Sequence, residues 1–155
     1  MPALPSDWPR LSAALFCADP RAAIDWYVRA FGFEVRILVA GDDGTVLHSE
    51  LVYGGAIVMV AGAGAPQPGK DWRACLATPT MTQGRVTQSL ALYVDDVDAH
   101  CARARSAGGR IVSALQTVDY GPEHWSDRNY AVVDPEGHLW WFLQRLSTRG
   151  VPHGA

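Results

Sequence analysis

The sequence predicts an α+β fold made of two tandem βαβββ modules, and two observations support this prediction. The first is an internal repeat, because residues 14–32 and 91–109 align without a gap at a constant offset of 77 positions. The second is that each repeat reads as a strand and a helix, followed by three strand-like segments. The 155 residues, 48% of them hydrophobic, suffice for a substantial core. The alternative is that two unrelated β-α units share this pattern by chance.

The first module, 11–61, opens with an apolar strand at 13–17 and a helix that starts after Asp19. An Asp at this position accepts hydrogen bonds from the free N–H groups of the first helical turn, and Pro20 suits the first helical position. Gly32 is a natural helix end because glycine tolerates left-handed φ. Three strands separated by Gly-containing turns then follow, at 33–39, 46–53 and 56–61.

The second module, 88–146, repeats this order with a strand at 90–94, a helix starting after Asp96 and a Gly108–Gly109 stop. Its three later strands are expected at 110–116, 129–133 and 138–144. The last two are joined by an Asp-Pro-Glu-Gly turn.

The two modules are expected to form one domain over residues 1–155. The segment 62–87 between them is rich in Gly, Pro, Thr and Gln, and it is too long for a plain connection. We therefore expect it to be a linker or lid, or a dimer contact.

Composition and charge exclude several classes of protein. Lys plus Arg is 13 and Asp plus Glu is 16, so no strongly basic face is available for nucleic acid or an anionic membrane. The longest apolar run, 56–65, is about half of the roughly 20 residues that a membrane span needs. Cys17, Cys75 and Cys101 are widely spaced and odd in number, which suits a reducing compartment. We expect a cytoplasmic protein.

Three segments carry a resemblance to a known family: Asp-Pro-Arg-Ala-Ala-Ile-Asp-Trp-Tyr at 19–27, Leu-Ala-Leu-Tyr-Val-Asp-Asp-Val-Asp at 90–98, and the stretch at 125–142 with its Trp-x-x-Arg and Asp-Pro-x-Gly words. Over residues 11–144 the chain resembles the vicinal oxygen chelate superfamily, which includes glyoxalase I, extradiol dioxygenases, fosfomycin-resistance enzymes and bleomycin-resistance proteins. The last segment is most similar to the bleomycin-resistance and uncharacterised glyoxalase-like branch. The resemblance implies curved mixed sheets around a cavity, and a homodimer.

The resemblance also implies where a metal would be bound. Counted from the helix starts and the Asp-Pro-Glu-Gly turn, the family's ligand positions correspond to Ser12, Glu50, Ser89 and Trp141. Only Glu50 has a side chain of ligand type, whereas a divalent site needs about three protein donors. The sequence therefore predicts the family fold with no metal and no cofactor.

Strand alternation predicts the residues that face the cavity, since side chains i and i+2 share one face. Aromatic and polar side chains at these positions are typical of small-molecule sites. Together with Trp125, which is expected in a loop at the mouth of the cavity, the residues expected to bind the ligand are Phe16, His48, Glu50, Tyr93, Arg128, Tyr130 and Trp141.

His48 and Glu50 are the candidate catalytic residues, because a carboxylate beside an imidazole can orient it as a general base. The same pair can bind a cationic ligand, contribute to an off-pattern metal site with a third donor such as His124, or simply line a wet groove. For Arg128, in a loop after Trp125, the alternatives are a ligand carboxylate and an ion pair with a strand-end carboxylate.

Two functions remain open. The leading hypothesis is a protein that binds a small, flat, largely apolar molecule, drugs and antibiotics included, without the family metal. The alternative is a superfamily lyase, isomerase or dioxygenase that uses His48 and Glu50, with or without an atypical divalent metal. Whether the protein is an enzyme stays undecided at this level.

Overall fold

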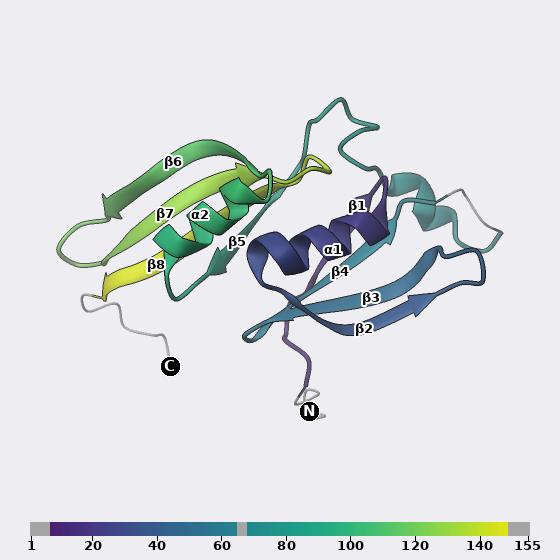
Figure 1. The fold of residues 1–155 in the computed structure, drawn as a ribbon, viewed down its shortest axis with the longest axis horizontal. Helices are drawn as coiled ribbons and strands as arrows, with labels where there is room; N and C mark the ends of the chain where they lie inside the picture. Colours follow the sequence, from purple (N-terminus) through teal and green to yellow (C-terminus); the bar gives the residue numbers. More distant parts are fainter. Residues whose placement is uncertain (1–6, 65–67, 149–155) are drawn as a thin grey trace. The chain divides into compact units, whose positions relative to one another are not determined.

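The computed structural model describes residues 7–64 and 68–148, which form two compact units that meet in the chain between Arg85 and Val86. Each unit is a four-stranded mixed sheet with one α-helix packed on one face (Figure 1). The predicted α+β fold of two tandem βαβββ modules is confirmed. Among the described residues, no helix has the length and apolar character that crossing a membrane requires.

The first unit has the strand order β1-β4-β3-β2, in which β1 and β4 are parallel and the other neighbours antiparallel. Its elements are β1 (Ala13–Cys17), α1 (Pro20–Phe31), β2 (Glu34–Ala40), β3 (Val46–Tyr53), β4 (Ala56–Gly62) and the 3₁₀ helix η1 (Asp71–Cys75).

Helix α1 begins and ends as the sequence predicts. The Asp19 side chain accepts a hydrogen bond from the Ala22 N–H at 3.0 Å, and Pro20 occupies the first turn. Gly32 ends the helix with φ of 79°, which residues with a Cβ rarely adopt. The helix buries one apolar stripe that includes Ile24 and Phe31 against the sheet.

The two faces of the first sheet differ in character. Leu15, Leu51 and Val60 are fully buried on the face that α1 covers. Cross-strand pairs place the alternate residues on the opposite face, which we call the first open face because no helix among the described residues of this unit covers it. It carries Ala14, Phe16, His48, Glu50, Val52, Ile57 and Met59.

The second unit repeats the topology, with the strand order β5-β8-β7-β6. Its elements are β5 (Ser89–Tyr93), α2 (Val97–Ser106), β6 (Arg110–Asp119), β7 (Trp125–Val133) and β8 (Leu139–Thr148). Strands β7 and β8 are longer than predicted, because antiparallel pairing continues to Trp125 opposite Thr148. The residues Trp-Ser-Asp-Arg at 125–128 lack an apolar pattern, yet their backbone groups pair in the ladder; the predicted loop at Trp125 and Arg128 is therefore wrong.

Helix α2 begins after Asp96, whose side chain accepts from the Ala99 N–H at 2.9 Å. The chain then turns tightly into β6 at Gly109, where an added Cβ would lie 2.9 Å from the Ala104 carbonyl oxygen. Only glycine fits such a close approach. This contact places α2 directly over the sheet.

Helix α2 covers the face of the second sheet that carries Tyr130, Val132, Trp140 and Phe142, all fully buried. The Tyr130 hydroxyl lies 2.7 Å from His100 Nδ1 on the helix. The prediction that Arg128 and Tyr130 share a face with Tyr93 and Trp141 is wrong, because the register with β8 pairs Arg128 with Gln144 and Tyr130 with Phe142, which lie on the opposite face. The face without a helix, the second open face, carries Ala91, Tyr93, Asp127, Asn129, Trp141, Leu143 and Arg145.

Candidate functional site

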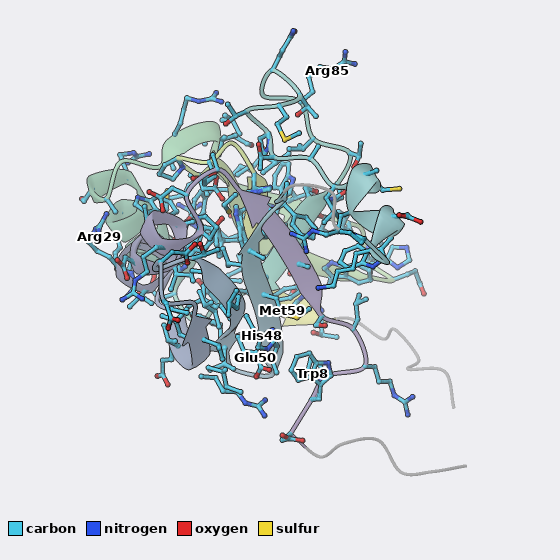
Figure 2. All side chains as sticks on the ribbon, turned by 90° about the vertical axis from the view of Figure 1, so that its right-hand side faces the viewer. Trp8, Arg29, His48, Glu50, Met59 and Arg85 are labelled. Carbon is cyan, nitrogen blue, oxygen red and sulfur yellow. The ribbon has the colours of Figure 1, made fainter. Side chains whose placement is uncertain are left out.

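The first candidate cluster is a network of charged groups around Glu50 on the first open face. Glu50 is only 6% exposed, and its Oε1 accepts a hydrogen bond from His48 Nε2 at 2.9 Å. Figure 2 shows the labelled His48 and Glu50 next to each other on β3. The Arg36 Nε lies 3.3 Å from the other oxygen, Oε2, as an ion pair without hydrogen-bond geometry. The guanidinium therefore balances the charge of this buried carboxylate.

Arg36 also ties the network to the segment before β1. Its Nη1 donates to the Asp7 carbonyl oxygen and its Nη2 to Asp7 Oδ2, each at 2.6 Å. A small pocket of about 260 Å³ lies beside these groups, near the lower end of small-molecule sites. It is lined by Asp7, Pro9, Arg36, Val52, Gly54, Gly55 and Ile57.

Sequence reasoning missed Arg36 for a structural reason. Strand β2 has an irregularity between Val35 and Ile37, so Arg36 is an extra residue in the ladder with β3. A bulge of this kind re-aims a side chain, and regular alternation cannot predict it.

The second candidate cluster, the Arg145 cluster, consists of Tyr93, Trp125, Asp127 and Arg145. Asp127 is 1% exposed and accepts from the Tyr93 hydroxyl at 2.9 Å and from Arg145 Nε at 2.6 Å. The Arg145 guanidinium lies 5.1 Å from the centre of the Tyr93 ring and 5.0 Å from that of Trp125. Two aromatic rings and a buried carboxylate thus hold the cation.

The Arg145 cluster has aromatic rings that are partly exposed to solvent. Tyr93 is 48% exposed and Trp125 is half-buried. Tyr120 and His124 extend the aromatic surface, with ring centres 5.5 and 5.8 Å from that of Trp125. Sequence reasoning missed Asp127 and Arg145, which face each other across β7 and β8, because the predicted β7 started only after Asp127.

The other predicted site residues divide between the two faces of their sheets. Phe16 and Trp141 are half-buried on the open faces. Arg128 forms a two-pronged ion pair with Asp98 of α2, with N–O distances of 2.6 and 2.7 Å. Of the two alternatives for Arg128, the structure therefore has the ion pair, but its partner lies on a helix rather than at the end of a strand. Tyr130 is enclosed beneath α2, and burial raises the pKa of its phenol. Neither Arg128 nor Tyr130 therefore lies on the second open face.

Tyr93 provides a prediction of pH dependence. Burial and the hydrogen bond to Asp127 raise the pKa of Tyr93, although Arg145 opposes this. The folded protein then holds the phenol proton more tightly than the unfolded chain, so the contribution of Tyr93 to stability is complete below pH ~10 and falls as the pH rises through the raised pKa. In urea unfolding across this range, the free energy of unfolding of Tyr93→Phe should decrease less steeply than that of the wild type. Identical slopes for the two proteins would contradict the prediction.

Comparison with known proteins defines the class. The chain belongs to the Glyoxalase/Bleomycin resistance protein/Dioxygenase superfamily, whose family model matches residues 11–142. The uncharacterized protein Mb0911c of Mycobacterium bovis is 38% identical over 134 residues, covering 85% of this chain and 80% of that protein.

Solved structures agree with this assignment. TioX from Micromonospora sp. ML1 is 34% identical with a TM-score of 0.65, covering 88% of this chain and 95% of that chain. A glyoxalase/bleomycin resistance protein/dioxygenase family enzyme from Burkholderia phytofirmans PsJN also has a TM-score of 0.65, covering 87% of this chain and 98% of that chain. Its 19% identity supports the shared fold alone.

The residues of this chain do not fit the metal of the superfamily's metal-binding members. Ser12, Ser89 and Trp141 offer no strong ligand, and the carboxylate of Glu50 is already paired with the cation of Arg36. Within residues 7–64 and 68–148, no three His, Cys, Asp or Glu side chains group closely enough to hold a metal ion.

Proposed function

We propose that the protein binds a small, flat, largely apolar molecule without the superfamily's metal, drugs and antibiotics being candidate ligands. The observation that carries this proposal is the Arg145 cluster on the second open face, where Tyr93 and Trp125 hold the guanidinium. Trp141 adds a half-buried indole on the same face. Aromatic rings of a ligand gain stacking and apolar contact from such a surface.

The charge balance on the second open face supports a ligand that is mainly apolar. Asp127 neutralises Arg145. This pair keeps polar groups on the second open face without requiring a ligand of opposite charge. A ligand can lie on the rings of Tyr93 and Trp125 while its polar edge contacts the pair.

A thermal-shift screen with planar aromatic compounds and bleomycin-type glycopeptides tests the proposal. A ligand present at 100 times its Kd adds ~2.7 kcal/mol to the free energy of unfolding, so a saturable rise of several degrees in Tm is expected. The absence of any saturable shift across the panel would count against binding.

A second candidate function is a superfamily lyase, isomerase or dioxygenase, favoured by the 2.9 Å contact of His48 Nε2 with Glu50. The exposed imidazole is reachable, and the carboxylate can orient it as a base. Glu50→Gln and His48→Ala separate the classes, since an enzyme loses turnover and keeps binding. Elemental analysis of untagged protein purified without chelator adds a check: about one equivalent of metal would favour the enzyme, and less than about a tenth would favour the binding protein.

The proposal extends to the assembly and setting of the protein. We expect a homodimer, which light scattering of the purified chain checks directly, and a cytoplasmic protein without a nucleic-acid partner, in line with its net charge of −3. The segment 62–87 is proposed as a lid or dimer contact, for which limited proteolysis with and without ligand provides a test.

A further inference from the structure

Asn129 has a buried polar atom that its surroundings in the fold do not use. The residue is 4% exposed, and its Oδ1 has no hydrogen-bond partner among the described residues. Buried side-chain oxygens in folded proteins are nearly always hydrogen-bonded, because a lost bond to water is costly when nothing replaces it. By contrast, Asp127, two residues earlier on the same face, has both carboxylate oxygens bonded.

The register of the second sheet places Asn129 among the proposed stacking residues. Asn129 pairs with Leu143 of β8, and Leu143 pairs on its other side with Tyr93 of β5. Trp141 pairs with Ala131, the next residue of β7 on the open face. The amide thus lies in the row of Tyr93 and Leu143, adjacent to the row that carries the Trp141 indole.

We infer that Asn129 Oδ1 accepts a hydrogen bond from the ligand, so that the second open face selects planar aromatic molecules with an N–H or O–H at the ring edge. This inference rests on the proposed binding function and specifies the ligand class. A ring lying against Trp141 and Leu143 would lie beside this amide, because Asn129 pairs with Leu143 and the next pair on the same face is Ala131 with Trp141. A molecule of the same shape without the donor leaves the amide oxygen unpaired and binds more weakly.

Two pairs of compounds of matched shape test the inference: carbazole against dibenzofuran, and indole against benzofuran. The members of each pair differ by an N–H in place of a ring oxygen. Calorimetric titration of the full chain should show about threefold to tenfold tighter binding of the N–H member. The Asn129→Leu variant, whose side chain has the same branching without a polar atom, should bind both members of a pair equally. Its Tm should be unchanged or raised, since the unpaired oxygen is removed.

Ser126→Ala is the matched control on the same strand. The Ser126 hydroxyl already bonds to Ser147 at 2.7 Å and lies on the face covered by α2, so this variant should keep the preference for the N–H compounds. In NMR spectra of the wild type, carbazole should shift the side-chain amide signal that is missing from Asn129→Leu. Dibenzofuran should shift it less. This measurement does not depend on how well the variant binds.

The outcomes separate the inference from the proposed function. Saturable and equal binding of both members of each pair by the wild type would overturn the role of Asn129 while keeping the binding function. A preference for N–H compounds that persists in Asn129→Leu would do the same. If none of the four compounds binds, both the inference and the proposed binding of small aromatic molecules on this face are overturned.

Discussion

Trp140→Ala is expected to lower the free energy of unfolding by ~3–5 kcal/mol, the largest effect of any change considered for this protein. The Trp140 side chain is 1% exposed beneath α2 and stacks on Phe142, with ring centres 5.9 Å apart. Its indole N–H donates to Asp134 Oδ2 at 2.9 Å, so truncation leaves both a cavity and a buried oxygen that loses this bond. Urea unfolding followed by circular dichroism measures the loss.

Trp140→Phe provides the matched control. It keeps an aromatic ring against Phe142 and removes the N–H donor to Asp134 with part of the indole volume, so a smaller loss of ~1–3 kcal/mol is expected. Equal losses for the two variants would mean that the hydrogen bond, rather than the packing, stabilises this part of the core. A loss below ~1 kcal/mol for Trp140→Ala would contradict the burial argument altogether.

Trp141→Ala, one residue further along β8, is expected to change stability little and ligand affinity strongly. Its half-buried indole lies on the second open face, so the free energy of unfolding should fall by only ~1 kcal/mol. Affinity for both carbazole and dibenzofuran should fall by about tenfold or more, because both compounds lose the same stacking surface. Calorimetric titration of each compound with the wild type and the variant measures this loss.

A comparison of variants separates stacking from hydrogen bonding. Trp141→Ala should weaken both members of a compound pair equally, whereas Asn129→Leu should abolish the difference between them. Unchanged affinity of both compounds for Trp141→Ala would show that the ligand does not lie on Trp141. A loss of affinity seen only for the N–H compound would show that the indole positions the donor of the ligand rather than stacking on its ring.

The Asp-Pro-Glu-Gly turn shows how much a short motif can predict. The sequence places a turn at 134–137, and in the structure Asp134 Oδ1 accepts from the backbone N–H groups of Gly137 and His138 at 2.8 and 2.9 Å. These are local bonds between near neighbours in the chain. The bond from the Trp140 indole to the same carboxylate depends on how the strand runs after the turn, and the motif alone does not predict it.

The two candidate clusters show where prediction from sequence ends. His48 and Glu50 are two residues apart on one strand, so alternation alone predicts that they share a face. Arg36 reaches Glu50 from another strand through a bulge, and Arg145 reaches Asp127 across β7 and β8. These contacts depend on strand register, which the hydrophobic pattern does not determine where the residues are polar.

By itself, the sequence determined the class of fold, the repeat of two modules and both helix starts, because these depend on hydrophobic periodicity and on capping groups within a few residues. The family followed from the resemblance of the segments 19–27, 90–98 and 125–142. The tertiary structure alone decided that Tyr130 lies beneath α2 while Asp127 and Asn129 lie on the second open face. The physical reason is the alternation of strand side chains. The register of β7 against β8, in which Tyr130 pairs with Phe142, decides which alternate residues meet the helix, and a register error of one residue exchanges the core with the site.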